Sequence, residues 1–100
     1  PYVTALITLD QDGVTHWRQM IGKHPVPPEL LMDDRELNVI LQRAIDEANK
    51  LVSRPESIRR FAVLPGDFTE LAGHVTPTMK LRRAAIERDF SKEIEELYVR

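Results

Sequence analysis

The stretch HVTPTMKLRR, residues 74–83, holds the side chains whose types and spacing could do chemistry. A Thr-Pro-Thr turn precedes Lys80, and an apolar pattern of helical spacing follows it. This order predicts a helix that begins at Lys80, with Thr76 or Thr78 as its cap and Pro77 in its first turn. Free backbone N–H groups, the positive end of the helix dipole and an ammonium group would then converge. The residues alone leave two interpretations open, an anion or phosphate site and a solvated basic face.

The other side chains of chemical interest form no catalytic or metal-binding pattern. His16, His24 and His74 occur without a Glu-x-x-His or His-x-His spacing, so we expect no metal site and interpret each as a surface or turn residue. No serine stands in a G-x-S-x-G motif, and the four glycines build neither a P-loop nor a G-x-G-x-x-G loop. Without any cysteine, the sequence has neither disulfides nor thiolate metal ligands.

Composition and charge indicate one domain without a nucleic-acid partner. One hundred residues, 42% of them hydrophobic, can bury a modest core. A net charge of -2 lacks the basic excess of nucleic-acid binders, and the pairs Arg59-Arg60 and Arg82-Arg83 lack interleaved aromatic residues. No apolar run approaches the roughly 20 residues that cross a bilayer, and the first residues do not resemble a signal peptide. We therefore expect a cytoplasmic protein, with any membrane association peripheral and at the inner face.

The elements that must position the Lys80 stretch begin with a strand at 2–9. Its nearly continuous apolar and β-branched residues are typical of a strand covered on both faces. The sequence opens directly into this strand without a starting methionine, which suggests a piece of a larger protein. A short amphipathic helix follows and stops at Gly22, and three prolines predict an extended loop over 23–30.

The remaining pattern predicts a long helix, further strands and a C-terminal helix. Apolar residues recur at helical spacing over 34–52, after a capping pair formed by Asp33 and Glu36. The elements expected after it are a strand at 58–64, a short strand at 74–76 and a helix at 80–98 with a break that Ser91 could cap. This order predicts an α+β fold, a small sheet of short strands covered by helices on both faces.

Three motifs within residues 59–98 form a specific combination. They are Leu64-Pro65, Asp67-Phe68-Thr69, and Thr76-Pro77-Thr78 followed by Lys80. In this order they resemble the C-terminal end of the AMP-forming long-chain fatty-acid–CoA ligases, which belong to the adenylate-forming superfamily. The opening PYVTALITLD and Trp17 also resemble the strand and helix that follow this family's hinge, so the resemblance covers nearly the whole chain.

The resemblance implies the C-terminal subdomain of the adenylate-forming enzyme fold. Residues 1–100 would form a single lid domain, a fragment of a larger enzyme that lacks the N-terminal ATP- and acyl-binding domain and the hinge. The partner of this lid would be its own N-terminal domain. Lids of this family alternate between two orientations, one for adenylation and one for thioester formation.

The activity that the resemblance implies is ATP-dependent conversion of a fatty acid to acyl-AMP, followed by transfer to CoA. Lys80 matches the family's catalytic lysine, which bridges the carboxylate and the α-phosphate. Thr76 and Thr78 would be binding residues on the loop of this lysine, and no metal ligand is expected. The full-length enzyme would use fatty acid, ATP, CoA and Mg²⁺, whereas the isolated chain is expected to bind no cofactor and to be inactive.

Met79 departs from the pattern of much of the superfamily, which has glycine immediately before this lysine. The Thr-Pro-Thr-hydrophobic-Lys form resembles the long-chain branch of the family. The alternative function is a stand-alone module that binds an anionic partner through the basic patch around Lys80. In the first case Arg82 and Arg83 are interpreted as surface residues, with contacts to substrate as the alternative, and in the second as part of the patch.

Overall fold

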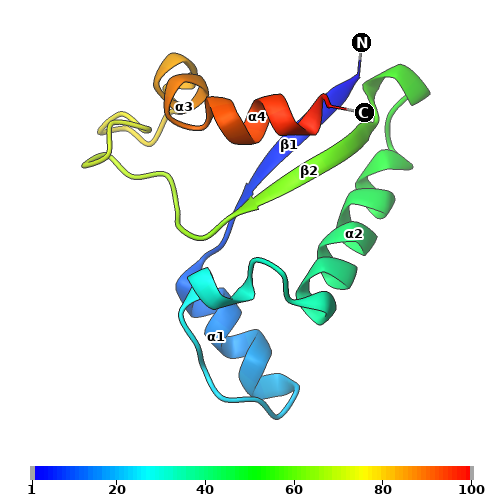
Figure 1. Ribbon diagram of the computed structural model, residues 1–100, viewed down its shortest axis with the longest axis vertical. Coiled ribbons are helices and arrows are strands. Elements are labelled where there is room, and N and C mark those ends of the chain that lie inside the picture. The colour runs from blue at the N-terminus through cyan, green and yellow to red at the C-terminus, as the bar shows by residue number, and fades with distance from the viewer. Residues whose placement is uncertain (1, 100) are drawn as a thin grey trace.

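The computed structural model describes residues 2–99. It consists of a two-stranded parallel sheet with helices around it (Figure 1). Its elements are β1 Val3–Thr8, α1 Gln11–Met20, η1 Pro28–Leu31, α2 Arg35–Asn49, η2 Arg54–Glu56, β2 Ile58–Leu64, α3 Arg83–Asp89 and α4 Ser91–Leu97, where η denotes a 3₁₀ helix. Because β1 and β2 are parallel neighbours, the chain must cross over between them, and α1 and α2 lie in this crossover. These elements confirm the predicted α+β class.

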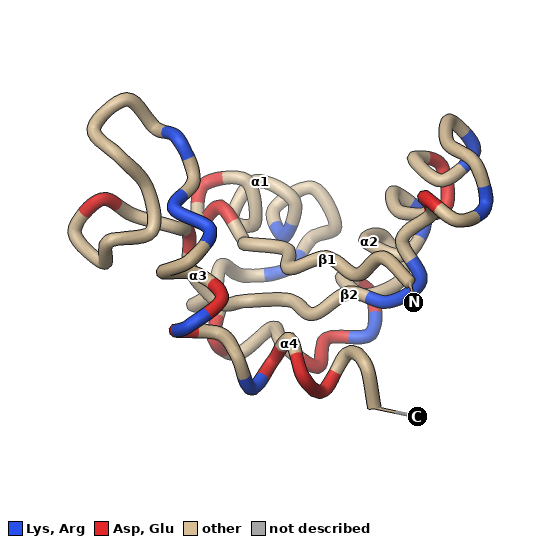
Figure 2. Tube along the Cα trace, turned by 90° about the horizontal axis from the view of Figure 1, so that it is seen from above, with Lys and Arg blue, Asp and Glu red and all other residues tan. Residues whose placement is uncertain are grey.

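Helices flank the sheet on both sides. Figure 2 shows α4 on one side of the strands and α1 on the other. Helix α4 packs on both strands and buries Leu97. Opposite to it, the main core cluster joins the end of β1 to α1, η1 and α2; it consists of Leu9, Val14, Leu31 and Leu37, with Trp17 and Val63 packed against it. The Asn49 side chain ties α2 to the sheet, because it donates to Ile58 O at 3.0 Å and accepts from Ile58 N at 2.8 Å.

Both strands lie in the predicted places, but β1 is less covered than its sequence indicated. Every residue from Thr4 to Thr8 is half-buried, and Val3 is 41% exposed. The reason is that β1 has a single strand neighbour among residues 2–99 and that α3 and α4 have only seven residues each. Helices thus lie on both faces of β1, as predicted, but they leave the strand half-buried.

Helix α2 begins one residue later and ends three residues earlier than its pattern predicted. The Asp34 side chain accepts a hydrogen bond from Leu37 N at 2.9 Å, so Asp34, and not Asp33, is the cap. Two adjacent aspartates left this register open in the sequence, and the burial of Leu37 in the core cluster fixes it. Glu36 does not close a capping box; it forms an ion pair with Lys23 instead.

Three other predictions on the helices can be compared with the structure. Gly22 follows α1 with a φ of 76°, which confirms the predicted stop. The η1 turn overlaps the end of the extended loop predicted over 23–30 and buries both of its own end residues. The helical stretch predicted at 80–98, with a break at Ser91, forms two helices, and the break falls one residue earlier, at Phe90. Ser91 does not cap α4, because Phe90 occupies the cap position and makes no side-chain hydrogen bond there.

An aromatic cluster holds the first strand against the last helix. The Tyr2 hydroxyl donates to Leu97 O at 2.8 Å, and the rings of Tyr2 and Tyr98 have centroids 5.0 Å apart. The Arg60 guanidinium lies 5.8 Å from the Tyr2 ring centre and donates to Leu97 O and Val99 O. These donors satisfy carbonyl groups that the end of a helix otherwise leaves free.

The Asp34 cap leads to a prediction on stability. Asp34→Ala removes the acceptor for Leu37 N, so we expect the free energy of unfolding to fall by about 1 kcal/mol. Asp33→Ala is the matched control and should change it by less than about 0.5 kcal/mol. Urea unfolding followed by circular dichroism measures both values. Equal losses in the two variants, or a larger loss for Asp33→Ala, would contradict the assignment of the cap.

Candidate functional site

Lys80 lies in a short hairpin and not at the start of a helix. The hairpin closes through Arg82 N, which donates to His74 O at 2.8 Å, and through Thr76 N, which donates to Lys80 O at 2.8 Å. The short strand predicted at 74–76 does not form as a strand. In its place there is an isolated antiparallel bridge between Val75 and Leu81. Helix α3 begins only after this hairpin, so the prediction of Lys80 in a first helical turn is wrong.

The threonines stabilise the turn of the hairpin and do not cap a helix. Met79 N donates to Thr76 O at 2.8 Å, which makes a β-turn with Pro77 at its second position. Thr76 Oγ1 accepts from Lys80 N at 3.0 Å and lies 3.2 Å from Thr78 Oγ1. The predicted cap is therefore wrong, since α3 has Arg82 at its cap position without a side-chain hydrogen bond. The same Thr-Pro-Thr sequence suits both arrangements, and the pairing of Thr76 with Lys80 decides for the turn.

Met79 has the backbone conformation that glycine adopts most easily. Its φ is 65°, and it is the one residue other than glycine with a positive φ among residues 2–99. A side chain in this region costs on the order of 1 kcal/mol or more. The strained residue lies directly before Lys80. At this position, much of the superfamily that the sequence resembles has glycine. The conformation that glycine favours is thus present here with a methionine.

The Lys80 side chain is exposed and available to a ligand. None of the ion pairs within the described chain involves it, whereas its own N–H is occupied by Thr76 Oγ1. Its ammonium group, and not its backbone, is thus the part that can meet an anion. Thr78 is exposed on the same turn, and Thr76 is half-buried. The structure therefore brings the three predicted site residues together, with Thr76 engaged in holding the turn.

His74 lies at the root of the hairpin and is a residue whose position the sequence reasoning missed. It is only 7% exposed, although we interpreted it as a surface or turn residue. Its ring centre is 5.6 Å from that of Phe68 and 5.3 Å from that of Phe90, and its Nε2 is 2.8 Å from Asp89 Oδ2. These partners come from separate parts of the chain, so the spacing of the histidines carried no signal of the burial.

Asp89 is held as a carboxylate. Hydrogen bonds from Arg88, first, and from His74 lower the pKa of Asp89 below its ordinary value. Because an ionised carboxylate only accepts, the hydrogen of the shared bond belongs to Nε2 of His74. The other ring nitrogen, Nδ1, is buried and has no hydrogen-bond partner in residues 2–99. The ring orientation therefore depends on Asp89 and on the two phenylalanines.

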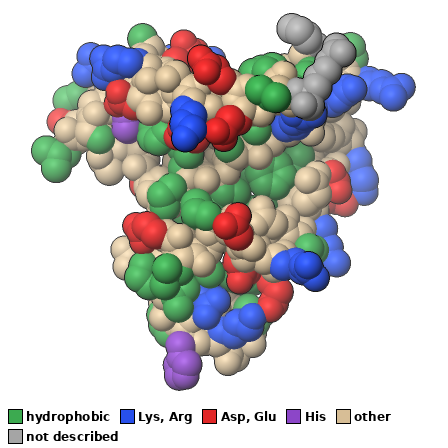
Figure 3. Space-filling view, viewed as in Figure 1, with side chains coloured by type: hydrophobic (Ala, Val, Ile, Leu, Met, Phe, Trp, Pro, Cys, Tyr) green, Lys and Arg blue, Asp and Glu red, His purple; other side chains and the backbone are tan. Residues whose placement is uncertain are grey.

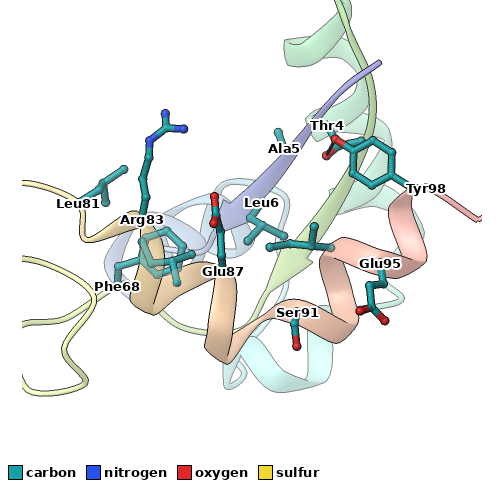
Figure 4. A pocket seen from close by; sticks show the side chains of 12 residues that line it. Thr4, Ala5, Leu6, Phe68, Leu81, Arg83, Glu87, Ser91, Glu95 and Tyr98 are labelled. Carbon is teal, nitrogen blue, oxygen red and sulfur yellow. Dashed lines mark hydrogen bonds between the residues drawn. The ribbon is translucent and has the colours of Figure 1, made fainter. Parts of the chain in front are cut away.

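An open groove of about 660 Å³ adjoins the hairpin. Figure 4 shows it between β1 and the helices α3 and α4, with Leu6 and Phe68 among the apolar residues that line it. Arg83 and Glu87 line it from α3, and Leu81 lines it from the hairpin. Hydrophobic side chains also gather in the middle of the face that Figure 3 shows, with charged side chains of both signs around them. A partner that covered the groove would thus lie beside the turn that carries Lys80.

Two findings bound what the described residues can do. Among residues 2–99, no group of three or more His, Asp and Glu side chains is placed to hold a metal ion. None of the helices in the same range has the length and the hydropathy that a membrane span requires.

Comparison with known proteins gives one family match and several similar proteins. Residues 22–100 match the family described as "AMP-binding enzyme C-terminal domain". The chain is 39% identical to the long-chain-fatty-acid–CoA ligase FadD15 of Mycobacterium tuberculosis over 98% of its own length. It is 36% identical to the putative fatty-acid–CoA ligase fadD11 of the same species over 97%, and 35% identical to the long-chain-fatty-acid–CoA ligase ACSBG2 of Gallus gallus over 90%. No solved structure matches at a significant level.

These relatives are much longer than the chain. It spans 16% of FadD15, 17% of fadD11 and 12% of ACSBG2. The ligase activity in the three names therefore belongs to the longer proteins, and this chain matches only about a sixth or less of each. The family match, in contrast, covers most of the chain and includes the whole Lys80 hairpin.

The conformation of Met79 leads to a second prediction on stability. Met79→Gly should raise the free energy of unfolding by about 1 kcal/mol, because glycine adopts this φ without strain and the methionine side chain is 71% exposed. Leu71→Gly is the matched control, since Leu71 is also exposed in this region but has no positive φ. This control should leave the protein unchanged or less stable. Thermal unfolding of both variants measures the effect, and a destabilised Met79→Gly variant would contradict it.

The His74–Asp89 pair leads to a prediction on pH. A lowered pKa means that Asp89 stabilises the fold above its unfolded value of about 3.9 and loses this effect as the pH falls through the folded value. Asp89→Asn should therefore lower stability at pH 7, and the difference from the unchanged protein should shrink below about pH 4. Urea unfolding at a series of pH values measures this difference. Glu70→Gln, which removes another exposed carboxylate, is the control. A difference that grew toward acid pH for Asp89→Asn would contradict the assignment.

Proposed function

Because this chain belongs to the family of AMP-binding enzyme C-terminal domains, we propose that it is the lid of a long-chain fatty-acid–CoA ligase and supplies Lys80 to the adenylation step. The observation that carries the proposal is the match over residues 22–100, in which an exposed lysine stands on a closed hairpin. Relatives that carry the name of fatty-acid–CoA ligase support the reaction class. The rest of the enzyme, including the domain that binds ATP and the acyl chain, is part of the proposal.

The proposed reaction has two steps. In the first, a carboxylate oxygen of the fatty acid attacks the α-phosphorus of ATP, pyrophosphate leaves, and acyl-AMP forms. In the second, the CoA thiol gives up its proton, its sulfur attacks the acyl carbon and AMP leaves, which gives the thioester. The first step brings a carboxylate against a phosphate, so a positive charge placed between them lowers its barrier.

Lys80 is suited to that first step by its positive charge and by the turn that holds its backbone. An ammonium group is a compact point charge with three donors, so it can contact the carboxylate and the α-phosphate at the same time. The turn holds the lysine backbone through Thr76, which limits the freedom of the residue before substrate arrives. Thr78 is exposed beside it and is the proposed second contact to the nucleotide. Thr76 is proposed to act chiefly by keeping the turn closed.

Mg²⁺ is proposed to act with ATP in the whole enzyme, and no residue of this chain is assigned as its ligand. Carboxylates and phosphates are the ligands that Mg²⁺ prefers, and residues 2–99 place no three acidic or histidine side chains together. We therefore assign to this chain no step that involves the metal. ATP, CoA and the fatty acid are proposed as substrates of the whole enzyme, and the isolated chain is expected to be inactive.

A lid must also leave the site before CoA reacts. The proposal is that the whole lid rotates between two orientations, so that the hairpin carries Lys80 in for adenylation and out for thioester formation. The closed hydrogen-bond pattern of the hairpin supports this, because a rigid tip can travel with the domain and needs no refolding. The groove beside the hairpin is a surface that one of the two orientations can cover.

The test is Lys80→Ala in the full-length enzyme. We expect fatty-acid-dependent exchange of pyrophosphate into ATP to fall roughly 10²- to 10³-fold, by analogy with the loss of one oxyanion donor. Thioester formation from acyl-AMP supplied ready-made should keep most of its rate. Lys92→Ala removes an exposed lysine from α4 and is the matched control, with both rates expected to stay near those of the unchanged enzyme.

The two half-reactions separate the outcomes. If exchange survives in Lys80→Ala, Lys80 is not the adenylation lysine and the proposed role is wrong. If both half-reactions fall equally, the substitution damages the fold or the docking of the lid, and the specific role is again wrong. The stand-alone binding module would be favoured instead if the 100-residue chain alone bound a polyanion with an affinity that fell steeply as salt rose.

A further inference from the structure

We propose that the pair formed by the buried His74 and the exposed Asp89 is a positioning device for Lys80, which fixes the direction of the hairpin relative to α3. This inference rests on the proposed role of Lys80 in adenylation. It concerns two residues that the sequence did not single out and that do not touch substrate in the proposal. Their effect on the reaction would pass through the backbone of the hairpin.

The backbone of His74 is part of the hairpin, whereas its ring packs against side chains outside the hairpin. Its carbonyl accepts from Arg82 N at 2.8 Å, which closes the hairpin, and its N–H donates to Thr69 O at 3.0 Å. Its ring is packed against Phe68 and Phe90 and is anchored to Asp89. Main chain and side chain are thus both held at one residue, so the root of the hairpin has little freedom to tilt.

The tip of the hairpin has no comparable anchor within the described chain. The hydrogen bonds around Thr76, Met79 and Lys80 all run between residues of the turn itself. They fix the shape of the turn but not its direction in space. That direction is set where the hairpin joins the rest of the molecule, and His74 is the buried polar residue at that junction.

Asp89 is itself oriented, which makes the anchor stiff. Arg88 Nε donates to Asp89 Oδ1 at 3.0 Å, while Oδ2 faces His74 Nε2 at 2.8 Å. Each carboxylate oxygen therefore has its own partner, and the carboxylate plane is fixed. Asp89 ends α3, so the pair connects the end of this helix to the root of the hairpin. Charge-assisted hydrogen bonds of this kind are stronger than neutral ones.

Without the His74 ring, the ammonium group of Lys80 would keep its charge but would be placed less accurately. If the ring of His74 is removed, Lys80 keeps its ammonium group but samples a wider range of positions. A displacement of about 1 Å at a reacting group can cost up to roughly 10²-fold in rate. We therefore expect a lower kcat for adenylation, with KM for ATP nearly unchanged, because the other domain is proposed to hold most of the nucleotide.

The experiment compares His74→Ala, Lys80→Ala and the double variant in the full-length enzyme. We expect His74→Ala to slow pyrophosphate exchange by about 10- to 100-fold while thioester formation from acyl-AMP stays near its normal rate. In the Lys80→Ala background the same change should have little further effect, because its target is already gone. His74→Gln, whose amide can donate to Asp89, should recover part of the rate. His16→Ala, an exposed histidine on α1, is the matched control and should leave exchange unchanged.

The outcomes distinguish the two proposals. Exchange that survives in Lys80→Ala overturns the role of Lys80 itself, whatever His74 does. If Lys80→Ala abolishes exchange but the effects of the two substitutions multiply in the double variant, His74 acts independently of Lys80 and the positioning role is overturned. Should His74→Ala fail to fold, Asp89→Asn provides the same comparison with the ring still in place. An equal loss in both half-reactions for Asp89→Asn would mean a purely structural role and would also overturn it.

Discussion

The parallel pairing of β1 with β2 is the constraint on which the rest of the structure depends. It joins residues more than 50 positions apart, and everything between them must return the chain to the same end of the sheet. The main core cluster forms within this crossover, on α1, η1 and α2. On the other side, α4 rests on both strands at once. If the pairing were lost, the two helical layers would have no common surface, because the sheet is what they share.

The hairpin that leaves β2 combines a fixed root with an exposed tip. At the root, burial, aromatic contacts and a charge-assisted hydrogen bond act on one residue, His74. At the tip, Lys80 has its backbone engaged and its ammonium group exposed. The backbone of Lys80 is thus ordered before an anion arrives, so that on binding only its side chain has to lose conformational freedom. The strained φ of Met79 is consistent with this arrangement, since strain of this kind persists only where surrounding contacts impose it.

Much of the fold could be predicted from the sequence, because periodicity reports directly on burial. β2 and most of β1 and α2 lie where their patterns placed them. The details that failed depend on contacts between distant residues. Thr-Pro-Thr suits a helix cap as well as a turn, and the pairing of Thr76 with Lys80 decides between them. The candidate site residues were predicted with the help of the family motifs, whereas the burial of His74 was missed, because its partners lie on other segments and leave no periodic signal.

The contact between Tyr2 and Leu97 has a mechanical consequence. It brings the beginning of β1 and the end of α4 to the same corner of the molecule, while the hairpin projects from the opposite side (Figure 1). If the proposed rotation of the lid turns about this corner, a small rotation there becomes a long arc at the far side. The molecule measures 40 × 34 × 26 Å, so the available arm is long compared with a hydrogen bond. In a hinged enzyme, a modest torque at that corner would be enough to move a single ammonium group from contact to complete separation.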